Sequence, residues 1–124
     1  MTKLQIGCLT LPFLLCSQNV MAESNVTTTG ELMNYCMAAD NIQVNFGSGY
    51  CMGNISGALL MSTSHQVYMS NEYGFKPTLC IPENWTIGQG IKVFLKWANN
   101  HPERLHEPDY AGVYASHLDA FRCK

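Results

Sequence analysis

The stretch that decides the fold is residues 80–123, which read CIPENWTIGQGIKVFLKWANNHPERLHEPDYAGVYASHLDAFRC. Apolar side chains recur there every three or four residues on either side of His101–His106. This period is typical of two amphipathic helices joined by a loop. The expected core faces are Ile87, Ile91, Phe94, Leu95 and Ala98 in the first helix and Tyr110, Val113, Tyr114, His117, Leu118 and Phe121 in the second.

Capping residues and prolines mark the ends of these two helices. Thr86 and Gln89 have the spacing of a capping box, so the first helix is expected to begin there. Pro102 ends it, because proline disfavours helical geometry in the residue before it. Pro108 suits the first turn of the second helix. A connection of about six to eight residues predicts that the two helices are antiparallel neighbours.

Two further helices are expected before this pair. Thr28 and Glu31 form a capping box ahead of a short helix over about residues 31–40, whose extension toward Phe46 stays open. A longer helix is predicted over residues 50–69. The two expected core faces are Leu32, Cys36 and Ala39, and Cys51, Ile55, Ala58 and Leu59.

Glycines occupy two places in this region. Gly47–Gly49 is typical of the turn between the two helices. Gly53 and Gly57 lie one turn apart inside the second helix, where each glycine costs roughly 1 kcal/mol against alanine. Close packing of the first helix on these two glycines would explain them. The sequence thus predicts an all-α bundle of about four helices in one domain, residues 23–124.

Residues 1–22 have the pattern of a secretory signal peptide. Lys3 precedes the apolar run Ile6–Leu15, and Ala22 offers a cleavage position. The run is shorter than the roughly 20 apolar residues of a membrane span. A lipoprotein modified at Cys16 is the weaker alternative, because a leucine stands where a small residue is expected. We therefore expect an exported, periplasmic domain without a membrane span.

Four cysteines remain after the expected cleavage: Cys36, Cys51, Cys80 and Cys123. In a small exported domain this number indicates two disulfides, for which three pairings are arithmetically possible. The helix arrangement favours Cys36–Cys51 across the first two helices and Cys80–Cys123 at one end of the helical hairpin. No pair has Cys-x-x-Cys spacing, so neither a metal site nor a cofactor is expected.

The charge and the polar residues exclude several classes of function. Residues 23–124 contain six basic and nine acidic side chains, a formal charge of −3, which disfavours nucleic-acid binding. An enzyme is not expected, since bridged sulfur atoms are no nucleophiles. His101 and His106 are expected to cap the preceding helix. We expect His117 to be partly buried and His65 to lie at the surface.

Several blocks of this sequence resemble one known family. They are Gly49–Gly57 (GYCMGNISG), Leu79–Pro82 (LCIP), Phe94–Leu95, His101–His106 (HPERLH) and Ala120–Cys123 (AFRC). Their order and spacing, together with the signal peptide and the four cysteines, are similar to the Rap/Tai family of type VI secretion immunity proteins. Two departures are Arg122, where the family has proline, and Asp109-Tyr110, where small apolar residues are usual.

The resemblance implies a small helical periplasmic protein that protects its cell from a peptidoglycan amidase delivered by a neighbouring cell. Effector and immunity protein form a toxin–antitoxin pair. The implied partner is a cognate amidase with a catalytic cysteine and histidine. The resemblance also implies a homodimer that can hold two effector molecules, as a 2:2 complex.

Two loops are the expected contact surfaces for such an amidase. Ser70–Thr78 exposes aromatic side chains, which either anchor a partner or tuck back against the core; the sequence leaves both open. Asn100–Glu107 carries charge, which complements a basic groove rim or is merely solvated. The candidate contact residues are Tyr73, Phe75 and Lys76 in the first loop and Glu103, Arg104, His106 and Glu107 in the second.

The alternative function is a small periplasmic acid-stress chaperone, because such proteins are also exported, helical and disulfide-linked. A chaperone of this kind unfolds or dissociates in acid and then binds many clients. Only 13% of the residues are charged, which is low for a protein that works by an acid-triggered change of charge. The composition therefore favours immunity.

Overall fold

The computed structural model describes residues 26–41 and 44–124. Within these ranges the secondary structure is helical, and the two isolated β-bridges form no strand. The elements are α2 (Thr29–Asp40), α3 (Phe46–Tyr73), α4 (Ile87–Asn100), the 3₁₀ turn η1 (Pro102–Arg104) and α5 (Asp109–Ala120). The expected all-α fold with four helices is confirmed, whereas the expected signal peptide at residues 1–22 lies outside the described residues. No described helix is long and apolar enough to cross a membrane.

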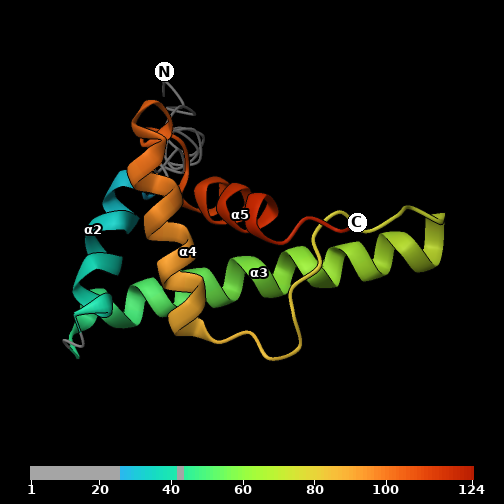
Figure 1. Cartoon of the computed structure of the whole chain (residues 1–124), viewed down its shortest axis with the longest axis horizontal. Helices are drawn as coiled ribbons and strands as arrows, with labels where there is room; N and C mark the ends of the chain where they lie inside the picture. Colours follow the sequence, from blue (N-terminus) through green and yellow to red (C-terminus); the bar gives the residue numbers. More distant parts are fainter. Residues whose placement is uncertain (1–25, 42–43) are drawn as a thin grey trace, which may run out of the picture.

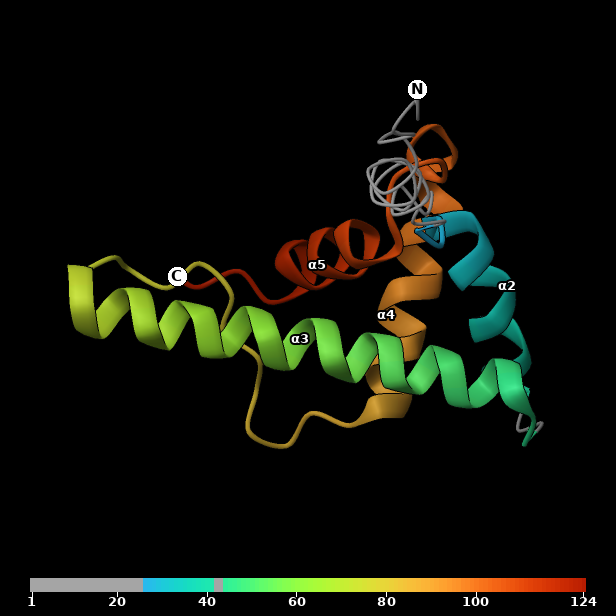
Figure 2. The same cartoon turned by 180° about the vertical axis from the view of Figure 1, so that it is seen from behind.

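The longest helix, α3, is the axis of the molecule. It has 28 residues and spans the long dimension in Figure 1. Figures 1 and 2 show α2, α4 and α5 gathered around its first half, whereas only irregular chain accompanies its last turns. The core therefore lies at one end of α3, and the other end protrudes.

The core is built from the expected faces of the four helices. Leu32, Ile55, Phe94 and Val113 are fully buried, one from each helix in turn. Tyr110 is the exception among the predicted core residues, because its side chain is 59% exposed. The remaining buried apolar residues are Cys36, Cys51, Leu59, Leu79, Ile91, Trp97 and Ala98.

The helix α3 is longer at both ends than the sequence predicts. Asn45 is its N-cap: its side chain accepts from the Ser48 amide at 2.9 Å, and the Ser48 hydroxyl accepts from the Asn45 amide at 3.0 Å. This capping box places Gly47–Gly49 inside the helix, so the predicted turn there is wrong. The helix ends at Gly74, whose left-handed φ of 70° suits glycine. Tyr73 thus belongs to the helix and not to the predicted loop.

The expected antiparallel hairpin of α4 and α5 is wrong. Figures 1 and 2 show α5 running across the direction of α4 instead of back along it. The connection between them is tied to the start of α2: Thr29 donates its amide to the Glu107 carbonyl at 2.8 Å, and Gly30 donates to Leu105 at 2.9 Å. The Asp109 amide in turn donates to the Thr27 carbonyl at 2.9 Å. These bonds direct α5 away from α4.

Close helix packing occurs at other glycines than the sequence suggested. A Cβ atom on Gly53 or Gly57 would meet nothing within 4 Å, so α2 does not pack there. At Gly112 of α5 a Cβ atom would lie 2.5 Å from Thr29 of α2, and at Gly47 it would lie 3.0 Å from Tyr35. The helix α2 therefore approaches the first turn of α3 through Tyr35 and the first turn of α5 through Thr29.

Both expected disulfides are present, each with a Cα–Cα distance of 5.0 Å. Cys36–Cys51 joins α2 to α3 inside the core. Cys80–Cys123 joins the segment after α3 to the C-terminal residues, where Leu79 and Arg122 form a β-bridge. The hydrogen bonds of this β-bridge are donated by the amides of Cys80 and Cys123, and the amide of residue 122 takes no part in them. Arginine and proline are therefore equally compatible with the hydrogen bonds at that position.

Candidate functional site

The protruding end of α3 carries an exposed aromatic pair. Tyr73 is 63% exposed and Phe75 is 60% exposed, so neither side chain tucks back against the core. We call residues 73–77 (YGFKP) the tip segment. Lys76 is also exposed and gives this segment a positive charge. Tyr73, Phe75 and Lys76, the predicted contact residues of the first loop, are thus all exposed at this end of α3.

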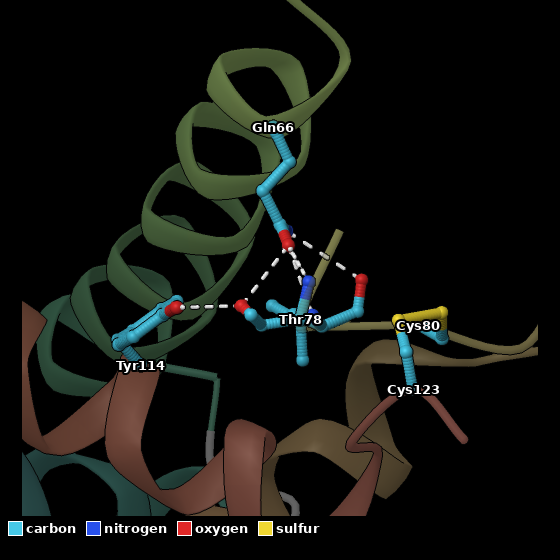
Figure 3. Close-up of a disulfide and its surroundings, with 6 residues drawn as sticks. Gln66, Thr78, Cys80, Tyr114 and Cys123 are labelled. Carbon is cyan, nitrogen blue, oxygen red and sulfur yellow. Dashed lines mark hydrogen bonds between the residues drawn. A yellow bond between two sulfur atoms is a disulfide. The ribbon is translucent and has the colours of Figure 1, made fainter. Parts of the chain in front are cut away.

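The chain behind the tip segment is attached to α3 by one side chain (Figure 3). The Gln66 Oε1 atom accepts from the Thr78 amide at 2.7 Å and from the Leu79 amide at 2.9 Å. The Thr78 hydroxyl lies 3.3 Å from the same oxygen and 3.4 Å from the Tyr114 hydroxyl of α5. Sequence reasoning missed Gln66, because a polar residue on an exposed helix carries no signal of a backbone partner 12 residues away.

The second predicted group lies around η1, and half of it is engaged internally. Arg104 donates two hydrogen bonds to the Glu107 carboxylate, each of 2.8 Å. These bonds hold the pKa of Glu107 below its usual range. The Arg104 guanidinium also lies 4.9 Å from the centre of the Trp97 ring. Glu103 and His106 are exposed.

The histidines of this loop have different roles. The His101 ring stacks on Trp97 at 4.5 Å between ring centres, and its Nδ1 atom lies 2.8 Å from the Trp97 carbonyl. His101 therefore caps the end of α4 as expected. For His106, no helix carbonyl in the described residues lies within hydrogen-bonding reach of the ring, so that prediction is wrong. His65 is exposed, as expected.

The two predicted contact groups lie at opposite ends of the folded molecule. Figure 1 shows the tip segment beyond the last turn of α3 and η1 beside the far end of α4. The view from behind in Figure 2 shows the same separation. One chain therefore does not present Phe75 and Glu103 on a continuous surface.

A third surface, which sequence reasoning missed, is an open groove of about 900 Å³ between α3 and α5. Gly53 and Gly57 lie along it, which explains why they face no other helix. The other residues that line it are Asn54, Ala58, Met61, Ser62, Arg104, Tyr110, Ala111, Tyr114, Ala115, Leu118 and Asp119. Tyr110 borders the groove, which accounts for its exposure.

A buried carboxylate joins the two helices that flank this groove. Asp109 at the start of α5 is only 7% exposed and accepts from Asn54 Nδ2 at 2.6 Å. The Tyr50 hydroxyl lies 3.3 Å from the same carboxylate oxygen, and the Tyr110 amide donates to the other at 2.7 Å. The Asn54 amide and the Tyr110 amide thus give each oxygen of this buried carboxylate a donor, as a buried polar group requires.

The described residues contain no constellation typical of catalysis. Their four cysteines are all bridged, and no group of three or more His, Cys, Asp or Glu side chains could hold a metal ion.

His117 is fully buried, and this burial lowers its pKa. Its Nδ1 atom lies 2.9 Å from the Val113 carbonyl. The exposed aromatic and apolar surfaces instead favour binding to another protein.

Fold and surfaces together define a class: a small all-α protein, stapled by two disulfides, that presents an exposed aromatic tip. The family model described as Rap1a immunity proteins matches residues 28–123, and the chain belongs to this family. The resemblance noted in the sequence is thereby confirmed. No curated protein and no solved structure matched the chain. Family membership indicates an immunity protein against a secreted effector, and such proteins are generally not enzymes. The two disulfides agree with an exported protein.

Proposed function

We propose that this protein is a periplasmic immunity protein that binds and inhibits a peptidoglycan amidase delivered by a type VI secretion system. The amidase is of the cysteine–histidine type, and its inhibition protects the producing cell from its siblings. The proposal combines membership of the Rap1a family with the resemblance to the Rap/Tai proteins. It includes export by the signal peptide at residues 1–22.

The observation that carries the proposal is the exposed aromatic tip segment on a supported helix end. Tyr73 and Phe75 are large, more than half exposed and located at the protruding end of α3. An amidase that cuts peptide stems has a groove for them, and a rigid loop can fill such a groove at a low entropic penalty. Tip-segment aromatics in the groove would exclude substrate from the catalytic cysteine.

A homodimer belongs to the same proposal. The charged group around η1 and the tip segment lie at opposite ends of one molecule, and two chains in a dimer can bring one of each to the same effector. A dimer would supply the tip segment from one chain and Glu103, His106 and their neighbours from the other. The expected assembly is a 2:2 complex, which light scattering after size exclusion would measure.

The test is to purify the chain with the amidase encoded beside its gene and to measure complex formation and peptidoglycan hydrolysis. A stoichiometric complex without hydrolysis is expected. Phe75→Ala should weaken binding roughly 30-fold, the effect of removing a buried aromatic anchor from an interface. Hydrolysis should return at protein concentrations where wild type still inhibits.

Phe46→Ala is the matched control, because Phe46 is also an exposed phenylalanine at an end of α3. Phe46 lies at the opposite end of α3 from the tip segment, so the Phe46→Ala variant should bind the amidase as tightly as wild type does. Folded protein and folded amidase that form no complex would exclude this pairing. Equal losses in the two variants would exclude the tip segment as the contact surface.

A further inference from the structure

We propose that Gln66 is a positioning residue that holds the tip segment in its binding conformation. The inference rests on the proposed function, since it explains how the tip segment keeps one conformation while it protrudes from the core. Gln66 itself lies on α3 almost two turns before Tyr73 and is not a contact residue.

The chain reverses direction between the tip and Gln66. Beyond Gly74, the Phe75 amide donates back to the Met69 carbonyl at 3.3 Å and the Gly74 amide to Ser70 at 3.0 Å. The chain then returns along α3, and Thr78 arrives beside Gln66. Lys76 and Pro77 therefore lie between two anchored points, which are Phe75 on one side and Thr78 on the other.

Gln66 provides the second of these anchors mainly through its side-chain oxygen, since its Nε2 atom donates only a long bond of 3.5 Å to the Leu79 carbonyl. Its Oε1 accepts from two consecutive amides, those of Thr78 and Leu79, at 2.7 and 2.9 Å. Two adjacent amides that converge on one oxygen form a small concave donor site for an acceptor. On the side of residues 78–79 that faces α3, this oxygen thus accepts the backbone hydrogen bonds that a neighbouring strand would accept in a sheet.

The other side of residues 78–79 is attached independently. The Cys123 amide donates to the Thr78 carbonyl at 2.9 Å, the Cys80 amide donates to the Phe121 carbonyl at 2.8 Å, and the Cys80–Cys123 disulfide adjoins them. These bonds attach the chain to the C-terminal residues but not to α3. Only Gln66 joins Thr78 and Leu79 directly to the helix that carries Tyr73, among the hydrogen bonds of the described residues.

Loss of this bond should act on the free protein more than on the complex. Without the acceptor, the tip segment samples several conformations, and only the competent fraction can bind. The association rate constant should therefore fall, whereas the dissociation rate constant should stay close to that of wild type. A contact residue such as Phe75 should behave in the opposite way, because lost contacts mainly raise the dissociation rate.

The experiment compares Gln66→Met, which keeps length and removes the acceptor, with Gln66→Glu, which keeps an oxygen at the same place. We expect faster hydrogen exchange at the Thr78 and Leu79 amides of Gln66→Met and an association rate roughly tenfold lower with the amidase. Gln66→Glu should restore both. Gln89→Met makes the same change at an exposed glutamine on α4 and should alter neither.

Each outcome decides the question. Unchanged exchange in Gln66→Met, or faster exchange with an unchanged association rate, overturns the role of Gln66. If Gln66→Met does not fold, Gln66→Asn makes the same test, since its amide is one carbon too short to reach Thr78. If wild type binds no amidase, the proposed function fails, and unchanged exchange in the variant would separately overturn the anchoring by Gln66.

Discussion

At the residue scale, His117 is more deeply buried than its place on an apolar helix face predicts, since partial burial was expected and the ring is fully buried. Its ring is fully buried between Trp85 and Phe121, with ring centres 6.2 and 6.1 Å away. One ring nitrogen meets the Val113 carbonyl, whereas Nε2 is buried without a partner in the described residues. Burial lowers the pKa of this ring, and the hydrogen bond to Val113 opposes that shift only in part.

This burial predicts a loss of stability in mild acid. The unfolded chain binds a proton on His117 near its ordinary pKa of 6.5, whereas the folded chain binds it only at lower pH. The contribution of neutral His117 is therefore complete above about pH 6.5 and is lost as the pH falls through the lowered folded pKa, with a slope of up to about 1.4 kcal/mol per pH unit.

Urea unfolding at a series of pH values between about 7.5 and 5 measures this slope. His117→Leu should flatten it, because leucine does not titrate. His65→Gln replaces an exposed histidine and should keep the wild-type slope. Identical slopes in wild type and His117→Leu would assign the acid sensitivity to other groups.

At the scale of the helices, some glycines lie at close helix contacts and others lie on open surface. The sequence places Gly53 and Gly57 on one face of α3, and a pair of this spacing is expected beneath another helix. The structure places them along the groove, where a methyl group meets nothing within 4 Å. Gly112, which no sequence pattern distinguishes, carries the closest approach of α5 to Thr29 of α2.

Alanine substitutions should therefore have opposite signs at these positions. Gly57→Ala should stabilise the protein by about 0.5–1 kcal/mol, since alanine restricts the unfolded chain and fits without strain. Gly112→Ala should destabilise it by about 1–3 kcal/mol, because its Cβ atom would overlap Thr29. Chemical denaturation measures both. A stabilised Gly112→Ala variant would contradict the close contact of α2 with α5.

At the scale of the whole molecule, the two disulfides differ in position and in exposure. Cys36 and Cys51 are fully buried in the core. Cys80 is exposed, and its bridge to Cys123 closes the longer loop, with a separation of 43 residues against 15. In the chain-entropy model, these loops correspond to about 4 and about 3 kcal/mol of stabilisation.

A mild reductant should therefore open Cys80–Cys123 first, because the attacking thiolate can reach it without unfolding of the core. Alkylation followed by peptide mass spectrometry would identify the opened bridge. Replacement of both Cys80 and Cys123 by serine should lower the free energy of unfolding by about 4 kcal/mol. An unchanged melting temperature would contradict this stabilising role, and reduction of Cys36–Cys51 at the same rate would contradict its burial.

Local patterns were sufficient for most of the helices. The spacing of Ile91, Phe94 and Ala98 and the capping box of Thr28 with Glu31 appear in the structure as expected. The start of α3 was missed because Asn45 caps it together with Ser48, a weaker signal than the glycines that follow. The antiparallel hairpin was wrong because bonds from Thr29 and Gly30, far away in the sequence, set the direction of α5.

The sequence by itself determined the all-α class and the family, and it favoured one of the three possible pairings of the four cysteines. These features depend on residue type, period and spacing, which are local properties of the chain. Only the tertiary structure decided that the aromatic residues of the tip segment are exposed and that Gln66 accepts from the Thr78 and Leu79 amides. It also decided that Gly53 and Gly57 line a groove and that the two predicted contact groups lie at opposite ends of the molecule. Such features depend on which distant backbone atoms meet, and packing alone decides that.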